Sequence, residues 1–562
     1  MHTVDLIIVL TYLMACILIG LYKSKSINTL KEYTLGNGSF SDIIIITTLF
    51  ATDMGATLTI GSVEKVYMFG VFFAITRMLM PVTWFAMVWI YGKNISQFRG
   101  CMSISDIMEL LYGTVGRWIT NIASVLVSIS IIALQATAMG YILHYFFKIP
   151  DSFGVIVSVF SLVIYSAFGG ISAVAITDVF QFVVFMIAIP ITCAIAYHDV
   201  GEYNGIVQSL PHEMSTLSIN KENILLFLGF IFYNLLPQSC GTFIQRFLIS
   251  KDTKQLTKCM KIVAILHIPL AVIICAIGFM IKVKAPDISP STSFIYFIEN
   301  YISIGFRGLI ISGILAVIMS TADSWLNTTS VLTVHDIVRK LIPLTEKQAL
   351  ISAKIITFII GILAIFLTLT GKGIIELGLL ASSFWEPLML VPLAAGFLKF
   401  RTNSKSFISA TIFAISFTAI SGYIVGDLAA TSLMCGVFGS AIGLFGMHYW
   451  QVHQGVLNVN TQQAKLTNTN INENANMDRK IALAESQGIH MFEDVEEQTK
   501  TIADELRKQS FIQGAEKGNL EGKEEVARNL LVQGLDIRII ENATGLSRKD
   551  LAKLQKNIKT TH

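Results

Sequence analysis

The chain has 562 residues, of which 53% are hydrophobic and only 14% are charged, and its mean hydropathy is +0.64. This composition excludes an ordinary soluble protein and indicates a polytopic membrane protein. The formal net charge of +3 is too small to indicate a class of partner. The seven cysteines show no metal-ligand spacing, so we expect free thiols.

Apolar windows of about 20 residues predict about thirteen membrane spans, and therefore an all-α membrane domain. The predicted spans lie at residues 4–22, 42–62, 68–91, 118–146, 152–170, 174–197, 223–245, 262–281, 303–334, 349–370, 374–397, 406–425 and 428–449.

Basic residues predict the orientation of these spans. Lys and Arg gather in alternate loops, whereas the other loops are poor in them and the longest, 199–222, is mostly acidic and polar. Basic loops mark the cytoplasmic side, so we predict a bacterial-type inner (plasma) membrane protein with its N-terminus outside and its C-terminus in the cytoplasm. The basic residues are Lys23, Lys25, Lys31, Lys93, Arg99, Arg117, Arg246, Lys251, Lys254, Lys258, Lys261, Arg339, Lys340, Lys347, Lys399, Arg401 and Lys405.

Two spans contain sequences that favour a break in the helix. The second holds Asp53 and Gly55 near its middle, and the seventh holds Pro237 and Gly241. Unwound backbone exposes carbonyl groups that can bind a cation, and it is tolerated at membrane depth only where it lines protein or a cavity. The breaks lie five spans apart, which is the pattern of an inverted repeat. The alternative for either break alone is a Gly or Pro kink without a ligand.

The ninth span places hydroxyl groups and an acid in an otherwise apolar stretch. Ser320 and Thr321 are adjacent, and Asp323 follows them. Polar side chains at this depth are costly unless they face protein, water or an ion, and their oxygens suit a hard cation such as Na⁺. The alternative is a helix that packs through small residues, with its hydroxyl groups bonded to its own backbone.

Several stretches, in this order and spacing, resemble the sodium:solute symporter family over roughly residues 1–450. The most specific contains Gly169-Gly170, Thr177-Asp178 and Gln181. The resemblance implies a leucine-transporter-like inverted-repeat fold. The matching stretches are residues 31–38, 51–54, 165–181, 244–247 and 320–324.

The resemblance also implies a site for Na⁺, the coupling ion, between the second and ninth spans. Its ligands are the main-chain carbonyl oxygens of Ala51, Met54 and Val317 and the hydroxyl oxygens of Ser320 and Thr321. Val317 stands where the family often has alanine, but a main-chain ligand should survive that change.

Two acids resemble residues of the family's ion path. Asp53 lies beside the proposed carbonyl ligands, and Asp178 lies where it could receive Na⁺ as the ion leaves towards the cytoplasm. For each acid, capping of a helix end is the alternative role.

The solute site departs from the proline transporters of the family. Alignment on Arg246 puts Tyr233, Pro237 and Gly241 where those proteins have a Trp, a Tyr and a Pro. We therefore expect a small amino acid or another small carboxylate, because an unwound helix can offer amide donors to an anion. The candidate pocket residues are Tyr233, Asn234 and Gln135, each of which could instead be a packed or helix-bridging residue. No role is assigned to Arg77, Lys354 or Glu386.

The composition changes near residue 455, so we predict a membrane domain at 1–454, a polar linker at 455–493 and a helical cytoplasmic tail at 494–562. The end of the tail has a helix-turn-helix pattern and resembles the C-terminal segment of recombination-promoting nuclease and transposase-like proteins. Its balanced charge argues against binding to nucleic acid, and a module that binds a protein partner is the better interpretation.

These observations predict a transporter rather than an enzyme. Its partners would be a small solute, Na⁺ and the lipid bilayer, and it would import the solute by alternating access. The alternative is a membrane sensor that signals through its tail.

Overall fold

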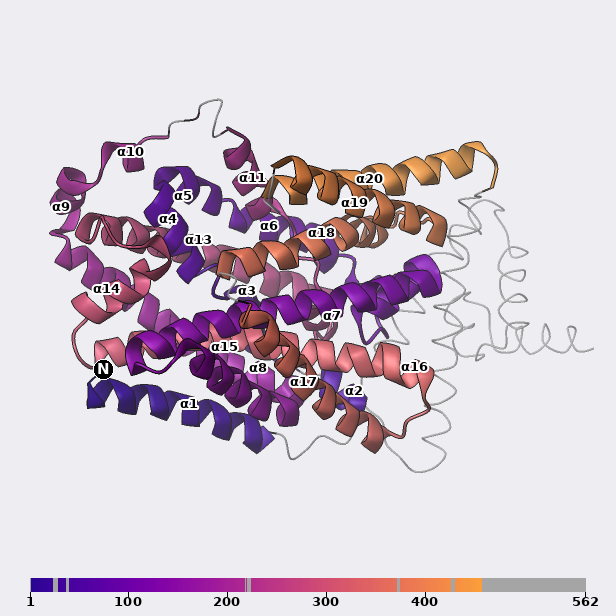
Figure 1. The fold of residues 1–562 in the computed structure, drawn as a ribbon. Coiled ribbons are helices and arrows are strands. Elements are labelled where there is room, and N and C mark those ends of the chain that lie inside the picture. Colours follow the sequence, from indigo (N-terminus) through magenta and orange to yellow (C-terminus); the bar gives the residue numbers. More distant parts are fainter. Residues whose placement is uncertain are drawn as a thin grey trace, which may run out of the picture. The chain divides into compact units, whose positions relative to one another are not determined.

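Helices make up all the regular secondary structure in the residues that the computed structural model describes (Figure 1). These are residues 2–456 apart from 24–28, 37–39, 218, 220–223, 371–373 and 426–429. The predicted all-α class is confirmed. The predicted linker, from residue 457 onwards, and the predicted tail lie outside the described residues.

The helices follow one another in the order α1 Thr3–Lys23, α2 Leu30–Leu35, α3 Asp42–Asp53, α4 Ile60–Phe69, α5 Val71–Arg77, α6 Met80–Met87, η2 Val88–Gly92, η3 Ile95–Phe98, α7 Ile104–Phe147, α8 Asp151–Asp199, α9 Glu202–Ser209, α10 His212–Ser215, α11 Ile224–Leu235, α12 Gly241–Leu248, α13 Thr253–Lys284, η4 Pro290–Thr292, α14 Ser293–Tyr301, α15 Phe306–Leu332, η5 Thr333–Val338, α16 Arg339–Leu341, α17 Glu346–Thr368, α18 Ile374–Phe397, α19 Ser404–Val425 and α20 Ala430–His453.

Each predicted span coincides with a helix, a part of one, or a run of short helices. Among the described residues, 9 helices are long and apolar enough to cross a membrane, and three shorter apolar helices lie within α8, α11 and α18. The remaining predicted span is the broken pair α3 and α4. The predicted spans 152–170 and 174–197 form one run, α8, which changes direction at Gly170, where φ is 55°.

Two helices begin well before the predicted spans. α7 begins at Ile104 and α13 at Thr253, because the side chains of Ser103 and Asp252 accept hydrogen bonds from main-chain N–H groups of their first turns. α7 changes direction at Gly113, where φ is 73°, so the predicted span lies within its second part. These first turns are polar, so a window of hydrophobicity misses them. The short helices α2, α9, α10 and α14 likewise lie in segments predicted as loops.

Both predicted breaks are present. α3 ends at Asp53 and α4 begins at Ile60, while α11 ends at Leu235 and α12 begins at Gly241. At the first break Met54 has φ −79° and ψ 68°, and the N–H of Gly55 donates to the carbonyl of Asp53 at 2.9 Å. This is an inverse γ-turn, which reverses the chain locally and frees the following peptide groups from the helix.

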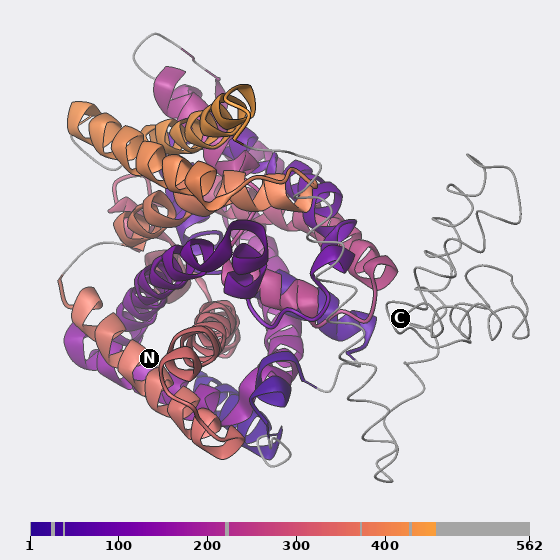
Figure 2. The same ribbon diagram turned by 90° about the vertical axis from the view of Figure 1, so that its right-hand side faces the viewer.

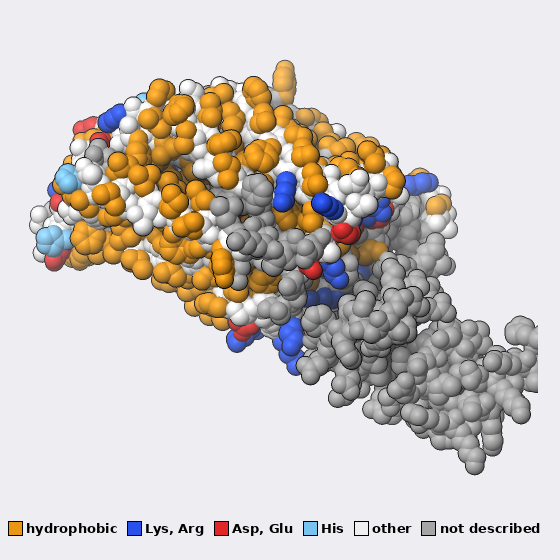
Figure 3. Space-filling model, turned by 90° about the horizontal axis from the view of Figure 1, so that it is seen from below, with side chains coloured by type: hydrophobic (Ala, Val, Ile, Leu, Met, Phe, Trp, Pro, Cys, Tyr) orange, Lys and Arg blue, Asp and Glu red, His pale blue; other side chains and the backbone are white. Residues whose placement is uncertain are grey.

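α15 lies at the centre of the membrane domain, in contact with α8, α7, α1, α17 and α3 (Figures 1 and 2). It is almost entirely buried, whereas α19 is mostly exposed. Hydrophobic side chains cover most of the face in Figure 3, and charged side chains gather towards its two ends. Such a surface suits the hydrocarbon core of a bilayer.

The beginning of α15 is held by a side chain from α1. The fully buried Oδ1 atom of Asp5 accepts hydrogen bonds from the N–H groups of Gly305 at 2.7 Å and Gly308 at 2.9 Å. An acid at this position also interacts favourably with the helix dipole.

Replacing Asp5 should therefore weaken the fold. Asp5→Ala leaves the buried N–H of Gly308 and the partly buried N–H of Gly305 without this acceptor, at a cost of about 1–3 kcal/mol for the buried group, whereas Asp5→Asn keeps an acceptor oxygen. We expect the unfolding temperature of the purified protein in detergent to fall by several degrees for Asp5→Ala and by clearly less for Asp5→Asn. Equal unfolding temperatures for Asp5→Ala and the parent would contradict this role.

Candidate functional site

Three of the predicted Na⁺ ligands meet where α3 approaches α15. The hydroxyl of Thr321 donates to the carbonyl of Ala51 at 3.3 Å and to the carbonyl of Val317 at 3.2 Å. All three residues are buried. Neighbouring oxygens around a cation with metal–oxygen bonds of about 2.4 Å lie at a similar separation. This arrangement can therefore bind a small hard cation without large movements of the backbone.

The backbone of the first break lies against the same hydroxyl group. A Cβ atom at Gly55 would lie 3.2 Å from Oγ1 of Thr321 and 2.7 Å from Nε2 of Gln135. Only glycine fits there without displacement of a neighbour. Met54 is fully buried, and its N–H donates to the carbonyl of Phe50 at 3.0 Å, so the Met54 carbonyl is the first one past the end of α3.

Ser320 and Asp178 form one hydrogen-bonded unit. The hydroxyl of Ser320 donates to Oδ1 of Asp178, and the hydroxyl of Thr48 donates to Oδ2 of the same carboxylate at 2.5 Å. Asp178 lies on α8 and is fully buried. The structure thus links a predicted ion ligand directly to the predicted ion-path acid. Thr48 was missed by the sequence analysis, although it lies one helical turn before Ala51 and so on the same face of α3.

Arg246 brings a positive charge to this region. Its guanidinium is fully buried and donates to Oε1 of Gln245 and to Oγ of Ser324, both at 2.7 Å. The negative charges of Asp178 and Asp323 act on it. The sequence analysis noted Arg246 as part of a family motif and counted it among the basic residues of a cytoplasmic loop. The second assignment is wrong, because Arg246 is fully buried within α12 and joins this helix to α15.

Asp53 is held on the side of α3 that faces α6 and α13. Its Oδ2 atom accepts a hydrogen bond from Nε1 of Trp84 at 3.0 Å and lies 3.1 Å from Nε2 of His267. This carboxylate therefore anchors the last turn of α3 to two neighbouring helices. Neither partner was predicted, although a single histidine within an apolar span was a signal that could have identified His267.

Of the three predicted solute-site residues, Gln135 lies beside the first break, and Tyr233 and Asn234 lie in the last turn of α11, just before the second. Gln135, on α7, accepts a hydrogen bond from the N–H of Ala56 at 3.1 Å and so lies beside the first break. Asn234, near the second break, uses its side-chain amide to donate to the carbonyl of Phe230 in its own helix at 2.9 Å. Tyr233 packs into an apolar cluster that includes Leu236.

Glu386 lies beside the second break. Ser239, within the break, donates to Oε2 of Glu386 at 3.1 Å and accepts a hydrogen bond from Nε1 of Trp385 at 3.3 Å. Glu386 is buried. Each break thus has a buried acid from a span, Asp53 at the first and Glu386 at the second.

The structure also contains a cavity of about 590 Å³ between α5, α8 and α13, close to α9. None of the ten predicted site residues lines it. Its walls are formed by Val71, Pro190, Cys193, Ala194, Tyr197, Ile206, Leu210, Ser215, Ile273, Ala276, Phe279 and Met280.

Comparison with known proteins identifies related families for both parts of the chain. Residues 33–413 match the model of the sodium:solute symporter family, and residues 520–556 match the C-terminal HTH domain of the Rpn/YhgA-like nuclease family. The sodium/pantothenate symporter of Escherichia coli K12 is 23% identical over 71% of this chain and 87% of its own length. The sodium/proline symporter of Staphylococcus aureus is 26% identical over 58% of this chain and 66% of its own length.

Solved structures share the fold. A Na⁺-coupled sialic acid symporter in its outward-open state superposes with a TM-score of 0.69 at 21% identity, over 79% of this chain and 97% of that one. Mhp1, a nucleobase-cation-symport-1 family transporter, gives a TM-score of 0.51 at 15% identity, over 75% of this chain and 94% of that one. The predicted leucine-transporter-like inverted repeat is confirmed. The chain belongs to the sodium:solute symporter family, and Na⁺ is its coupling ion.

Proposed function

We propose that this protein imports a small amino acid or another small carboxylate, driven by inward flow of Na⁺ through alternating access. The observation that carries the proposal is the meeting of the Ala51 and Val317 carbonyls with the Thr321 hydroxyl at the first break. It supports the proposal because oxygen atoms that could bind a cation would then lie where one helix of an inverted repeat is unwound.

Na⁺ would bind by displacing a hydrogen bond rather than by opening the structure. The Thr321 hydroxyl proton lies between oxygens that could all face an ion, so rotation of this hydroxyl would turn a lone pair towards Na⁺. The Ser320 oxygen and the Met54 carbonyl would complete the site. Ser320 can keep its bond to Asp178 meanwhile, because a hydroxyl oxygen donates and accepts at once.

Asp178 would bind the ion after it leaves the first site. Its carboxylate already accepts from the Ser320 hydroxyl, so an ion that leaves the first site moves towards a full negative charge. The charge of Arg246 acts on this acid and would limit how tightly it holds Na⁺. The negative charge of Asp53 would favour a cation at the first site. Its contacts with Trp84 and His267 would hold the end of α3 in place.

The solute would lie between the two breaks. Unwound peptide N–H groups and the Gln135 amide are suited to a carboxylate. Glu386 offers a negative charge that an amino-acid ammonium group could meet. Tyr233 and Asn234 would line the side of the second break. A solute with both charged groups therefore suits this arrangement best.

The orientation and the tail complete the proposal. The N-terminus would lie outside a bacterial-type inner membrane and the C-terminus in the cytoplasm, as the basic loops predict. A linker at 455–493 would then connect the membrane domain to a tail at 494–562 that binds a protein partner rather than nucleic acid. The match of residues 520–556 to an HTH domain favours a helical module there and keeps a sensor as the second candidate function.

Uptake by purified protein in proteoliposomes tests the proposal. Labelled amino acids and small carboxylates would be offered with an inward Na⁺ gradient, with an equal K⁺ gradient, and with neither. We expect uptake of at least one solute that requires the Na⁺ gradient. A chain that ends at residue 456 should transport equally well at matched abundance. Solute binding without uptake, with a tail-dependent output, would favour the sensor instead.

The proposed ion site predicts a specific loss of Na⁺ affinity. Ser320→Ala with Thr321→Ala removes two oxygen ligands, and contacts of this kind are worth about 1.5–3 kcal/mol each. The half-saturating Na⁺ concentration for uptake should therefore rise at least about tenfold. Val317→Ala is the matched control, since it keeps the main-chain carbonyl, and it should change this value little. A double variant with the parent's Na⁺ dependence would show that other residues form the site.

Asp178 should affect the rate of transport more than the affinity for external Na⁺. Asp178→Asn keeps the size of the side chain but removes the charge that would receive the ion. We expect turnover to fall by about tenfold or more, because loss of a charged contact costs at least about 1.4 kcal/mol, which corresponds to a factor of ten. The affinity for external Na⁺ should change less. Asp199→Asn, at the far end of α8, is the control. Normal turnover in Asp178→Asn would leave this acid with a structural role.

A further inference from the structure

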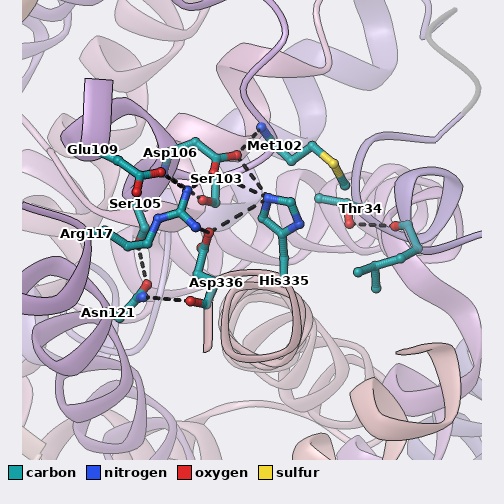
Figure 4. Close-up of polar contacts among 11 residues, drawn as sticks. Thr34, Met102, Ser103, Ser105, Asp106, Glu109, Arg117, Asn121, His335 and Asp336 are labelled. Carbon is teal, nitrogen blue, oxygen red and sulfur yellow. Dashed lines mark hydrogen bonds and ion pairs between the residues drawn. The ribbon is translucent and has the colours of Figure 1, made fainter. Parts of the chain in front are cut away.

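A second group of ionisable side chains lies outside the proposed transport site. Asp106, in the first turn of α7, faces His335 and Asp336 of η5, and the three side chains point towards one another (Figure 4). One donor atom from each lies within 4.8 Å of the other two. Nε2 of His335 is 3.1 Å from Oδ2 of Asp106 and 3.8 Å from Oδ1 of Asp336.

The geometry of η5 explains why two consecutive residues reach the same point. η5 is a π-helix, whose wider turn reduces the angle between successive side chains and which is often found at functional sites. The main chain is fixed from the other side, since the carbonyl of Asp336 accepts from Asn121 of α7 at 3.5 Å. On α7, Oδ2 of Asp106 also accepts from the N–H of Met102 at 2.9 Å.

Negative charge exceeds positive charge in this group. Three carboxylates, from Asp106, Glu109 and Asp336, face the single guanidinium of Arg117. Arg117 contacts Asp106 at 2.9 Å and also contacts Glu109, but it reaches Asp336 only at 4.0 Å. An imidazole that binds a metal is neutral, and in that form of His335 the group carries an excess of two negative charges, which a divalent cation would neutralise.

Asp336 is the member whose surroundings are incomplete. Its side chain is 0% exposed, and neither carboxylate oxygen has a hydrogen-bond partner among the described residues. Nitrogen atoms of Arg117 and His335 lie 4.0 and 3.8 Å from it, and the side chain of Ser103 faces it as well. A fully buried carboxylate whose possible cationic partners lie this far away is costly and requires an explanation.

We propose that Asp106, His335 and Asp336 form a binding site for a divalent transition metal ion such as Zn²⁺. An imidazole nitrogen with two carboxylate oxygens is a ligand set that Zn²⁺ uses, with a fourth position for water. The observed donor separations need only small side-chain adjustments to surround one ion. Arg117 stays with Glu109 and the outer oxygen of Asp106. The bound ion joins the beginning of α7 to the end of α15 through η5.

Metal binding to the full-length protein, purified without an affinity tag, tests this site directly. Co²⁺ is the probe, because its absorption bands report a low-coordinate nitrogen and oxygen environment, and Zn²⁺ is the competitor. We expect saturation at one Co²⁺ per chain, displacement by Zn²⁺, and a higher unfolding temperature with Zn²⁺ than without it. No saturable binding would overturn the proposal and leave an ordinary ion-pair network.

Two variants locate the site, and a third controls for exposed histidines. His335→Gln and Asp336→Asn each remove one ligand and should weaken Co²⁺ binding by more than about 100-fold, since loss of even an outer-shell partner typically costs 10–100-fold. His144→Gln removes an exposed imidazole near the other end of α7 and should bind as the parent does. Parent-like affinity in either ligand variant would overturn the assignment. If one of them fails to fold, the other and the parent's stoichiometry still decide.

Discussion

The unwound backbone of the first break is the constraint on which the rest of this structure depends. Peptide groups that leave a helix inside a membrane lose their hydrogen bonds where no water replaces them, at a cost of several kcal/mol each. Here side chains from α7, from α15 and from the break itself take over. Gln135 accepts from Ala56, Thr59 donates to Gly55, and Thr321 donates to Ala51. α7 and α15 must therefore both lie against the break, and the contact from α15 belongs to the proposed ion site.

Two buried acids near the first break are likewise held by side chains of other helices. Asp53 is held by Trp84 and His267, and Asp178 by two hydroxyl groups. Removal of one partner from such a pair typically costs about 3–5 kcal/mol, so these acids fix the relative positions of the helices that they join. Arg77 differs, because its fully buried guanidinium has no hydrogen-bond partner in the described part of the chain. The negative charge of Asp53 acts on this guanidinium.

Much of the fold could be predicted from local sequence, whereas the contacts within the site could not. The length of the apolar stretches identified the spans, and Gly55 and Pro237 identified the breaks. Both predictions were possible because hydrophobicity and the conformational preferences of Gly and Pro act locally along the chain. The bond between Thr48 and Asp178 joins residues 130 apart, and that between Ser239 and Glu386 joins residues 147 apart. Such pairs depend on how the helices pack. The resemblance to a family supplied the set of Ala51, Val317 and Thr321, yet it could not show that the amide of Asn234 bonds within its own helix.

The Thr321 hydroxyl would let Na⁺ enter and leave the proposed ion site at a low cost in free energy. Carbonyl oxygens that face one another repel, and a cage made only of carbonyls would relax outward whenever its cation left. The proton of Thr321 lies between the Ala51 and Val317 carbonyls and takes the place of a cation's charge. Entry of an ion then requires rotation about a single C–O bond rather than repacking of α3 against α15. A site built in this way keeps its size through the cycle, so ion release can be fast even though every ligand is buried.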